Sequence, residues 1–121
     1  MEEKLSYRNT VRLFAGEKCF GPGVAQLLRH VQEFHSLRSA AKAMNMAYSK
    51  AWGIIRTAET VFGCKLLSST IGGAHGGGAV LTPEAERLLA AYEAYCADVG
   101  TYAQGKFEDA FRFYRDLDHR P

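Results

Sequence analysis

The pattern of apolar positions between residues 36 and 62 predicts two helices separated by a tight turn. Ser36 is suited to the N-cap of the first helix, because its hydroxyl can accept a hydrogen bond from a free backbone N–H group. Asn45 is suited to the turn, since asparagine tolerates the left-handed conformation that ends a helix. Apolar residues recur at helical spacing on both sides of this turn, at Leu37, Ala40, Ala41 and Met44 and then at Ala51, Ile54, Ile55, Ala58 and Phe62.

Small residues mark the place where these two helices would cross. Ala40 and Ala41 face the second helix, and only short side chains let two helices cross steeply after so brief a turn. This combination is typical of a helix-turn-helix, whose second helix lies in the major groove of DNA. An ordinary αα-hairpin within a helical bundle remains the alternative.

The preceding segment predicts a small β-hairpin and a helix. Residues 10–20 contain two runs of strand formers on either side of a turn at Gly16. A helix follows from about Val24 to Phe34, with Pro22 suited to its first turn. The residues expected to face inward are Leu27, Leu28, Val31 and Phe34.

A glycine-rich segment follows the second helix of the pair. The strand patterns KLLSS and AVLT enclose the sequence TIGGAHGGG, and together they span residues 65–82. A hairpin directly after a helix-turn-helix is the wing of a winged helix. Its glycines would let the backbone approach a phosphate chain closely, although a merely flexible loop tip is the alternative. A nucleotide-binding loop is disfavoured, since the segment lacks a P-loop ending and leads into a strand.

A long helix begins at Thr82-Pro83, a hydroxyl N-cap followed by proline. Its apolar residues form a heptad-like seam that continues, after one stutter, towards the end of the chain. Gly100 and Gly105 each weaken the helix by roughly 1 kcal/mol relative to alanine, so a kink or break could lie there. We predict that residues 83–121 pair with the same helix of a second subunit; folding back on their own domain is the alternative. The expected interface residues are Leu89, Tyr92, Cys96, Val99, Ala103 and Phe107.

The formal net charge of +2 is unevenly distributed along the chain. Residues 36–82 carry five basic residues against the single acid Glu59, a balance of +4. Residues 1–35 carry five basic and four acidic residues, and residues 83–121 carry five basic and eight acidic ones, which gives balances of +1 and −3. The positive segment coincides with the predicted helix-turn-helix, where contact with a polyanion would need it.

Composition narrows the class of protein further. A chain of 121 residues with 47% hydrophobic and 23% charged residues fits one soluble domain. No apolar run is long enough to span a bilayer and the N-terminus is not signal-like, so we expect a cytoplasmic protein with no membrane partner. The three cysteines, Cys19, Cys64 and Cys96, predict buried thiols, and His30 and His35 lack further ligands at metal-binding spacing. With no nucleophile beside a base and no cofactor fingerprint, neither an enzyme nor a bound cofactor or metal is expected.

The stretch SLRSAAKAMNMAYSKAWGIIRTAETVFG, followed by STIGGAHGGGAVLT, resembles the N-terminal DNA-binding domain of ModE-type molybdate-responsive regulators. More distantly it is similar to the LysR-type winged helix. The resemblance covers about residues 8–105, and its most specific parts are Lys50-Ala51-Trp52 and the glycine-rich wing. It implies a mainly α fold with small β-hairpins: a winged helix-turn-helix in residues 1–82 and a dimerisation helix in residues 83–121.

The resemblance also implies which residues meet DNA. The segment from Ala47 to Arg56 would enter the major groove, with the wing on the backbone or minor groove. Trp52 either packs between wing and helix, the favoured interpretation, or touches a thymine methyl. The residues expected to face double-stranded DNA are Tyr48, Ser49, Lys50, Trp52, Gly53 and Arg56, with Ser36 and Arg38 near phosphates and His75, Gly76 and Gly77 in the wing.

Three departures from the family pattern keep a second hypothesis open. Ala47 replaces a hydroxyl N-cap, Ser69 stands where arginine is common, and His75 stands where lysine is common. These changes would remove phosphate contacts, so the alternative is a protein-interaction or dimerisation module without DNA binding of its own. The main hypothesis is a homodimeric transcriptional regulator whose effector is unknown. Residues 1–121 do not include the oxyanion-binding domain of full-length regulators, so the resemblance does not imply molybdate binding.

Overall fold

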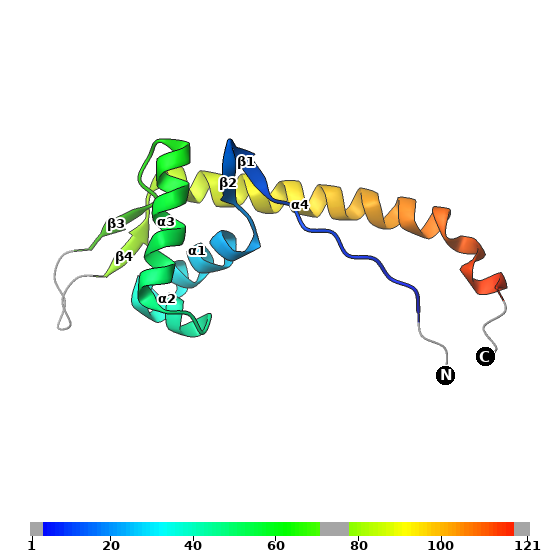
Figure 1. The fold of residues 1–121 in the computed structure, drawn as a ribbon, viewed down its shortest axis with the longest axis horizontal. Helices are drawn as coiled ribbons and strands as arrows, with labels where there is room; N and C mark the ends of the chain where they lie inside the picture. Colours follow the sequence, from blue (N-terminus) through cyan, green and yellow to red (C-terminus); the bar gives the residue numbers. More distant parts are fainter. Residues whose placement is uncertain (1–3, 71–77, 118–121) are drawn as a thin grey trace.

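A helix of 28 residues, α4 (Pro83–Ala110), runs along most of the molecule, and the elements that precede it in the sequence gather around its first half (Figure 1). The structure is a computed structural model that describes residues 4–70 and 78–117. It confirms the predicted mainly α class with small β-hairpins. The remaining elements are β1 (Leu13–Ala15), β2 (Glu17–Phe20), α1 (Pro22–Phe34), α2 (Leu37–Ala43), α3 (Tyr48–Phe62), β3 (Leu67–Ser69), β4 (Ala79–Leu81) and a final 3-10 helix, η1 (Arg112–Asp116).

Both predicted hairpins are present as two-stranded antiparallel pairs. Strands β1 and β2 turn at Gly16, whose φ of +83° favours glycine, and their pairing ends at Leu13 opposite Phe20. The chain enters α1 directly after Phe20, so residues before Leu13 have no strand to pair with. The first strand is therefore shorter than the sequence pattern predicts.

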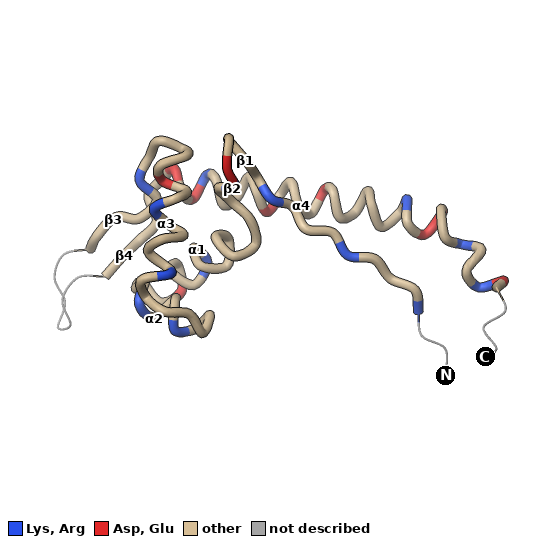
Figure 2. The backbone as a smooth tube through the Cα atoms, in the orientation of Figure 1, with Lys and Arg blue, Asp and Glu red and all other residues tan. Residues whose placement is uncertain are grey.

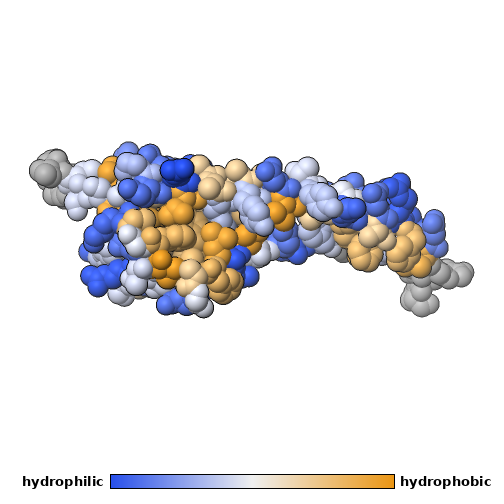
Figure 3. Space-filling view, turned by 90° about the horizontal axis from the view of Figure 1, so that it is seen from above, coloured by the Kyte–Doolittle hydropathy of each residue, from blue (hydrophilic) through white to orange (hydrophobic). Residues whose placement is uncertain are grey.

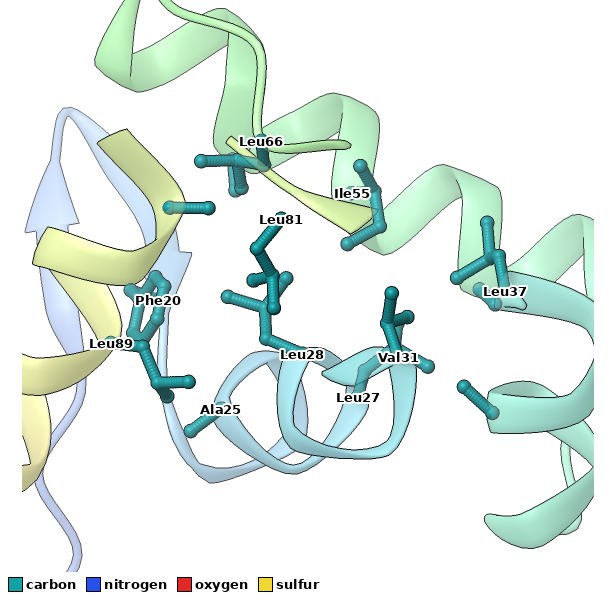
Figure 4. Close-up of a cluster of buried hydrophobic side chains, with 14 of the residues drawn as sticks. Phe20, Ala25, Leu27, Leu28, Val31, Leu37, Ile55, Leu66, Leu81 and Leu89 are labelled. Atoms are coloured by element: carbon teal, nitrogen blue, oxygen red, sulfur yellow. The ribbon is translucent and has the colours of Figure 1, made fainter. Parts of the chain in front are cut away.

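The core lies between α1, α3, the wing strands and the start of α4 (Figure 4). Leu27, Leu28 and Val31 of α1 are fully buried, as expected from their spacing. Burying a side chain of this size stabilises a fold by about 1.5–3 kcal/mol. The ring of Phe20 packs against that of Tyr92, with 5.0 Å between centroids, and so joins the N-terminal hairpin to α4.

Phe34 does not face inward as predicted; its side chain is 43% exposed. It is the last residue of α1, and its ring stacks on His30 at 5.8 Å on the surface. His35 then takes a left-handed conformation, with a φ of +56°, and directs the chain towards α2. Phe34 therefore lies at the exposed end of α1, outside the core.

Helix α4 begins as predicted, lacks the kink or break considered at its glycines, and ends at Ala110, before the end of the predicted segment 83–121. The Thr82 hydroxyl accepts a hydrogen bond from the Ala85 N–H at 3.1 Å and donates to the Lys65 carbonyl at 2.7 Å. The helix passes through Gly100 and Gly105 without a break, because glycine keeps the N–H and C=O groups of the helical ladder. The change of direction comes only after Ala110, where η1 follows.

The first part of the α4 seam is buried within its own chain. Leu89 and Tyr92 are 1% and 7% exposed, and the Tyr92 hydroxyl donates to the Val11 carbonyl at 2.7 Å. Their assignment to a dimer interface is therefore corrected: a second subunit cannot reach side chains that the core already covers. The predicted boundary between residues 82 and 83 likewise does not divide the core, which continues to Tyr92.

The outer half of α4 is covered on one side by the N-terminal segment. The Tyr7 hydroxyl donates to the Gly100 carbonyl at 3.2 Å, and its ring lies 5.2 Å from that of Phe107. The seam residues Cys96, Val99, Ala103 and Phe107 remain half-buried. Of the three thiols, only Cys19 is fully buried, whereas Cys64 and Cys96 are partly exposed. No helix in the described residues is long and apolar enough to cross a membrane.

Candidate nucleic-acid interface

The turn between α2 and α3 is held by a complete set of backbone hydrogen bonds. Asn45 has a φ of +57°, as predicted, and its N–H donates to the Lys42 carbonyl at 3.0 Å. The Met46 N–H donates to the Ala41 carbonyl at 3.0 Å, which completes a Schellman motif. At the other end of α2, the Ser36 hydroxyl accepts from the Ser39 N–H at 3.0 Å. Helix α2 is therefore capped at both ends, which fixes the direction in which α3 leaves it.

Small side chains bring α2 and α3 into close contact. Ala40 and Ala41 of α2 and Ala51 of α3 are each at most 1% exposed, as the sequence pattern predicts. Ile55 and Ala58 extend the buried side of α3 and are fully covered. The opposite side of α3 is left free for solvent or a ligand.

The exposed side of α3 carries polar, small and basic residues. Ser49, Trp52, Gly53 and Arg56 follow one another at helical spacing and are all exposed, and Lys50 lies beside them. Neither Lys50 nor Arg56 forms an ion pair among the residues that the structure describes. Figure 2 shows further Lys and Arg residues on α2, next to this surface.

Glu59, the one acid of α3, is directed away from the exposed side. Its carboxylate accepts a hydrogen bond from the Leu66 N–H at 2.9 Å, just before β3. This bond joins the end of α3 to the start of the wing. The exposed side of α3 consequently keeps an uncompensated positive charge.

Two aromatic residues organise the side of α3 nearest the wing. The Arg38 guanidinium lies over the Tyr48 ring, 4.1 Å from its centroid, in a cation–π contact that joins α2 to the first residue of α3. The Tyr48 ring meets the Trp52 indole edge to face, with centroids 6.4 Å apart. Arg38, Tyr48 and Trp52 line a groove of about 460 Å³ together with Ser68 and Ser69 of the wing. Trp52 is 36% exposed, and it lines this groove beside the wing residues.

The base of the wing is tied to the corner between α1 and α2. The Ala79 N–H donates to the His35 carbonyl at 2.9 Å, while the Gly78 N–H donates to the Thr70 hydroxyl at 2.8 Å. A Cβ at position 78 would lie 2.4 Å from the His35 carbonyl oxygen, so this close approach requires glycine. The sequence places Gly78 at the end of the glycine-rich segment, and from the sequence His35 is considered only as a possible metal ligand. The one sequence signal that separates Gly78 from the other glycines of this segment is its position directly before the second strand of the wing.

The predicted site residues thus fall into three groups. Arg38, Tyr48 and Trp52 share the groove beside the wing, and Ser49, Lys50, Gly53 and Arg56 share the exposed side of α3. Ser36 caps α2 and also lines the groove beside the wing. His75, Gly76 and Gly77 lie outside the described residues. In the described part of the chain, no group of three or more His, Cys, Asp or Glu residues is placed to hold a metal ion.

A helix-turn-helix with an exposed second helix, followed directly by a β-hairpin, defines the winged helix-turn-helix class. Residues 24–86 match the family model of the bacterial regulatory helix-turn-helix proteins of the LysR family, and the chain belongs to this family. The resemblance found in the sequence is thereby confirmed.

Relatives with known names match the same region. The chain is 36% identical over 73 residues to the molybdenum-pterin-binding protein MopB of Rhodobacter capsulatus, a match that covers 60% of this chain and 27% of MopB. It is 36% identical over 72 residues to the transcriptional regulator ModE of Haemophilus influenzae, covering 60% of this chain and 28% of that protein. The ModE of Yersinia pestis is 35% identical over 82 residues, covering 68% of this chain and 29% of its own length. The chain therefore spans between a quarter and a third of the length of these relatives, two of which are named as transcriptional regulators.

Proposed function

We propose that this protein is a sequence-specific transcriptional regulator that binds double-stranded DNA as a homodimer. The observation that carries the proposal is the exposed side of α3, where Ser49, Gly53 and Arg56 stand at helical spacing with Lys50 beside them. The single acidic residue of α3, Glu59, accepts a hydrogen bond from the Leu66 N–H. A helix of this kind can enter the major groove without facing the phosphates with a negative charge.

Individual roles follow from the chemistry of the side chains. Lys50 and Arg56 can neutralise phosphates or donate to guanine O6 and N7. Ser49 lies in the first turn of α3, from which side chains reach base edges. The cation–π contact with Tyr48 holds Arg38 beside the wing groove, in a position to meet a phosphate. Ser36 supports the site indirectly, since its hydroxyl caps α2.

The homodimer is proposed from the outer half of α4 and from the segment around η1 that follows it. Figure 3 shows apolar residues along one side of this end of the molecule and polar residues along the other. Phe111, Phe113 and Leu117 are 47%, 53% and 50% exposed, which is costly for a monomer in water. A second copy that covers these residues, with Val99 and Ala103 at its centre, would place two α3 helices on two half-sites. In such dimers the half-sites lie about 34 Å apart.

Titration of DNA binding against salt tests this proposal. Fluorescence anisotropy with DNA sites selected from a random pool should give a log–log salt slope of roughly −0.9 for each phosphate neutralised. The selected sites should have two-fold symmetry. A flat salt response, with no selection from the pool, would contradict the proposal and favour the protein-interaction module instead.

A further inference from the structure

A pocket of about 600 Å³ opens on the side of α3 that faces away from the wing. Helix α3 contributes Lys50, Gly53, Ile54 and Thr57, whose spacing of three, one and three residues forms a stripe opposite Tyr48 and Trp52. The other walls come from the β1–β2 hairpin and the first turn of α1, which Figure 1 places beside α3. The pocket is therefore separate from the groove beside the wing.

Three cationic side chains converge on this pocket from separate parts of the chain. Arg12 precedes β1, Lys18 belongs to β2, and Lys50 belongs to α3. No acidic residue of the described chain lines the pocket, and none of the three cations has an ion pair among the residues described. Like charges gathered around one concavity raise the local concentration of anions.

The floor of the same pocket is apolar. It is formed by the buried side chains of Cys19 and Phe20, with the half-buried Val24 and Ile54 beside them. A volume of this size, with apolar walls and a few convergent polar groups, is typical of sites for small organic molecules. A bare phosphate would satisfy the cations but would leave this floor in contact with water.

We propose that the pocket binds a small organic anion, a molecule with an acidic group for the three cations and an apolar body for the floor. Lys50 and Gly53 belong both to this pocket and to the proposed DNA-facing side of α3. A bound anion would neutralise Lys50 and occupy space beside α3, so it would act as an effector that weakens DNA binding. The effector role rests on the proposed function, whereas binding of the anion does not.

The binding experiment uses the full chain without DNA and a defined probe. The probe is 1-anilinonaphthalene-8-sulfonate, an organic anion, and its uncharged counterpart N-phenyl-1-naphthylamine is the control ligand. In ¹⁵N-labelled protein, we expect the sulfonate to shift the amide resonances of Lys18, Gly21, Gly53 and Thr57. Arg12→Gln and Lys18→Gln should each weaken its binding about tenfold, as expected for the loss of one charge-assisted hydrogen bond. Lys106→Gln, which removes a cation on the outer half of α4, should leave the affinity unchanged.

Three results would overturn the proposal. Shifts confined to the aromatic end of α4 would place the probe elsewhere, and equal affinity in the Arg12→Gln and Lys18→Gln variants would remove the cations from the site. Displacement of the probe by inorganic phosphate at equal concentration would reassign the pocket to simple phosphate binding, such as that of a DNA backbone.

The effector role is tested separately from binding. If the chain binds DNA, the probe at a concentration far above its own dissociation constant should raise the dissociation constant for DNA in the wild type. At the same probe concentration, this increase should be about tenfold smaller in Lys18→Gln. A probe that binds the pocket without changing DNA affinity would refute the effector role alone. A chain that binds the probe but no DNA would refute the proposed function and leave the organic-anion site in place.

Discussion

The backbone N–H of Ala79 donates to the carbonyl of His35 at 2.9 Å, and this bond joins the second strand of the wing to the corner between α1 and α2. His35 presents that carbonyl because it ends α1 in a left-handed conformation. The wing is thus positioned by the same corner that introduces the helix-turn-helix. Two parts of the proposed DNA interface share one anchor.

Replacing the glycine at this anchor should destabilise the protein. In Gly78→Ala the new Cβ would meet the His35 carbonyl oxygen at 2.4 Å, so the wing must shift. We expect a loss of about 1–3 kcal/mol in the free energy of unfolding, measured by urea denaturation. Gly105→Ala is the matched control: its Cβ meets nothing within 4 Å, and it should stabilise α4 by about 1 kcal/mol. Equal stability of the Gly78→Ala variant and the wild type would show that the wing does not depend on this contact.

Removing the basic residues of α3 should weaken DNA binding in a way that separates their roles. If Lys50 or Arg56 meets a phosphate, its replacement by alanine should weaken binding to all sequences and reduce the salt slope by about 1. If the residue reads guanine, the variant should lose about 1–3 kcal/mol of discrimination at one base position. Lys106→Ala removes a cation that lies over the Tyr102 ring on α4 and should change neither quantity. Unchanged affinity in both α3 variants would remove these residues from the interface.

Tyr92 should make the stability of the protein sensitive to alkaline pH. Burial, the largest cause, raises the pKa of Tyr92 to about 12, whereas an unfolded tyrosine ionises near pH ~10. The folded state therefore keeps a proton that the unfolded state loses, so the stability from this group is complete below about pH 10 and is lost as the pH rises towards 12. The free energy of unfolding should fall more steeply in this range for the wild type than for Tyr92→Phe.

The matched control for this titration is Tyr95→Phe, since the Tyr95 side chain is 56% exposed. It should retain the pH dependence of the wild type. Near neutral pH, Tyr92→Phe should also cost about 1 kcal/mol, because the hydrogen bond to the Val11 carbonyl is lost. Parallel pH profiles for the wild type and Tyr92→Phe would contradict the assignment of the shift to this hydroxyl.

A charge on the outer seam of α4 should separate the proposed dimer. Ala103 is half-buried on the side that also carries Val99 and Phe107, so Ala103→Glu would place two like charges across a two-fold interface. Sedimentation equilibrium should then show an association constant for the dimer that is about tenfold or more lower than in the wild type. Thr101→Glu, at an exposed position of the same helix, should leave the association constant unchanged. A wild-type chain that sediments as a monomer at all concentrations would refute the homodimer itself.

The sequence by itself determined where α2 and α4 begin and where the turn of the helix-turn-helix lies. Ser36, Asn45 and Thr82 were each assigned correctly as caps or turns, because the hydrogen bonds they make reach only three or four residues along the chain. The helix crossing at Ala40 and Ala41 could also be predicted from the sequence, because the helical spacing of these residues and their small side chains both indicate it. Such features are governed by local backbone geometry, which residue type restricts directly.

The tertiary structure decided which residues serve the core of one chain and which remain for a partner. A heptad-like seam does not distinguish the two, and Leu89 and Tyr92 proved to belong to the core because Phe20 and Val11, far away in the sequence, cover them. The contact of Gly78 with His35 and the convergence of Arg12, Lys18 and Lys50 on one pocket arise in the same way. These contacts join segments tens of residues apart, and their formation depends on how whole elements pack rather than on the spacing within any one of them.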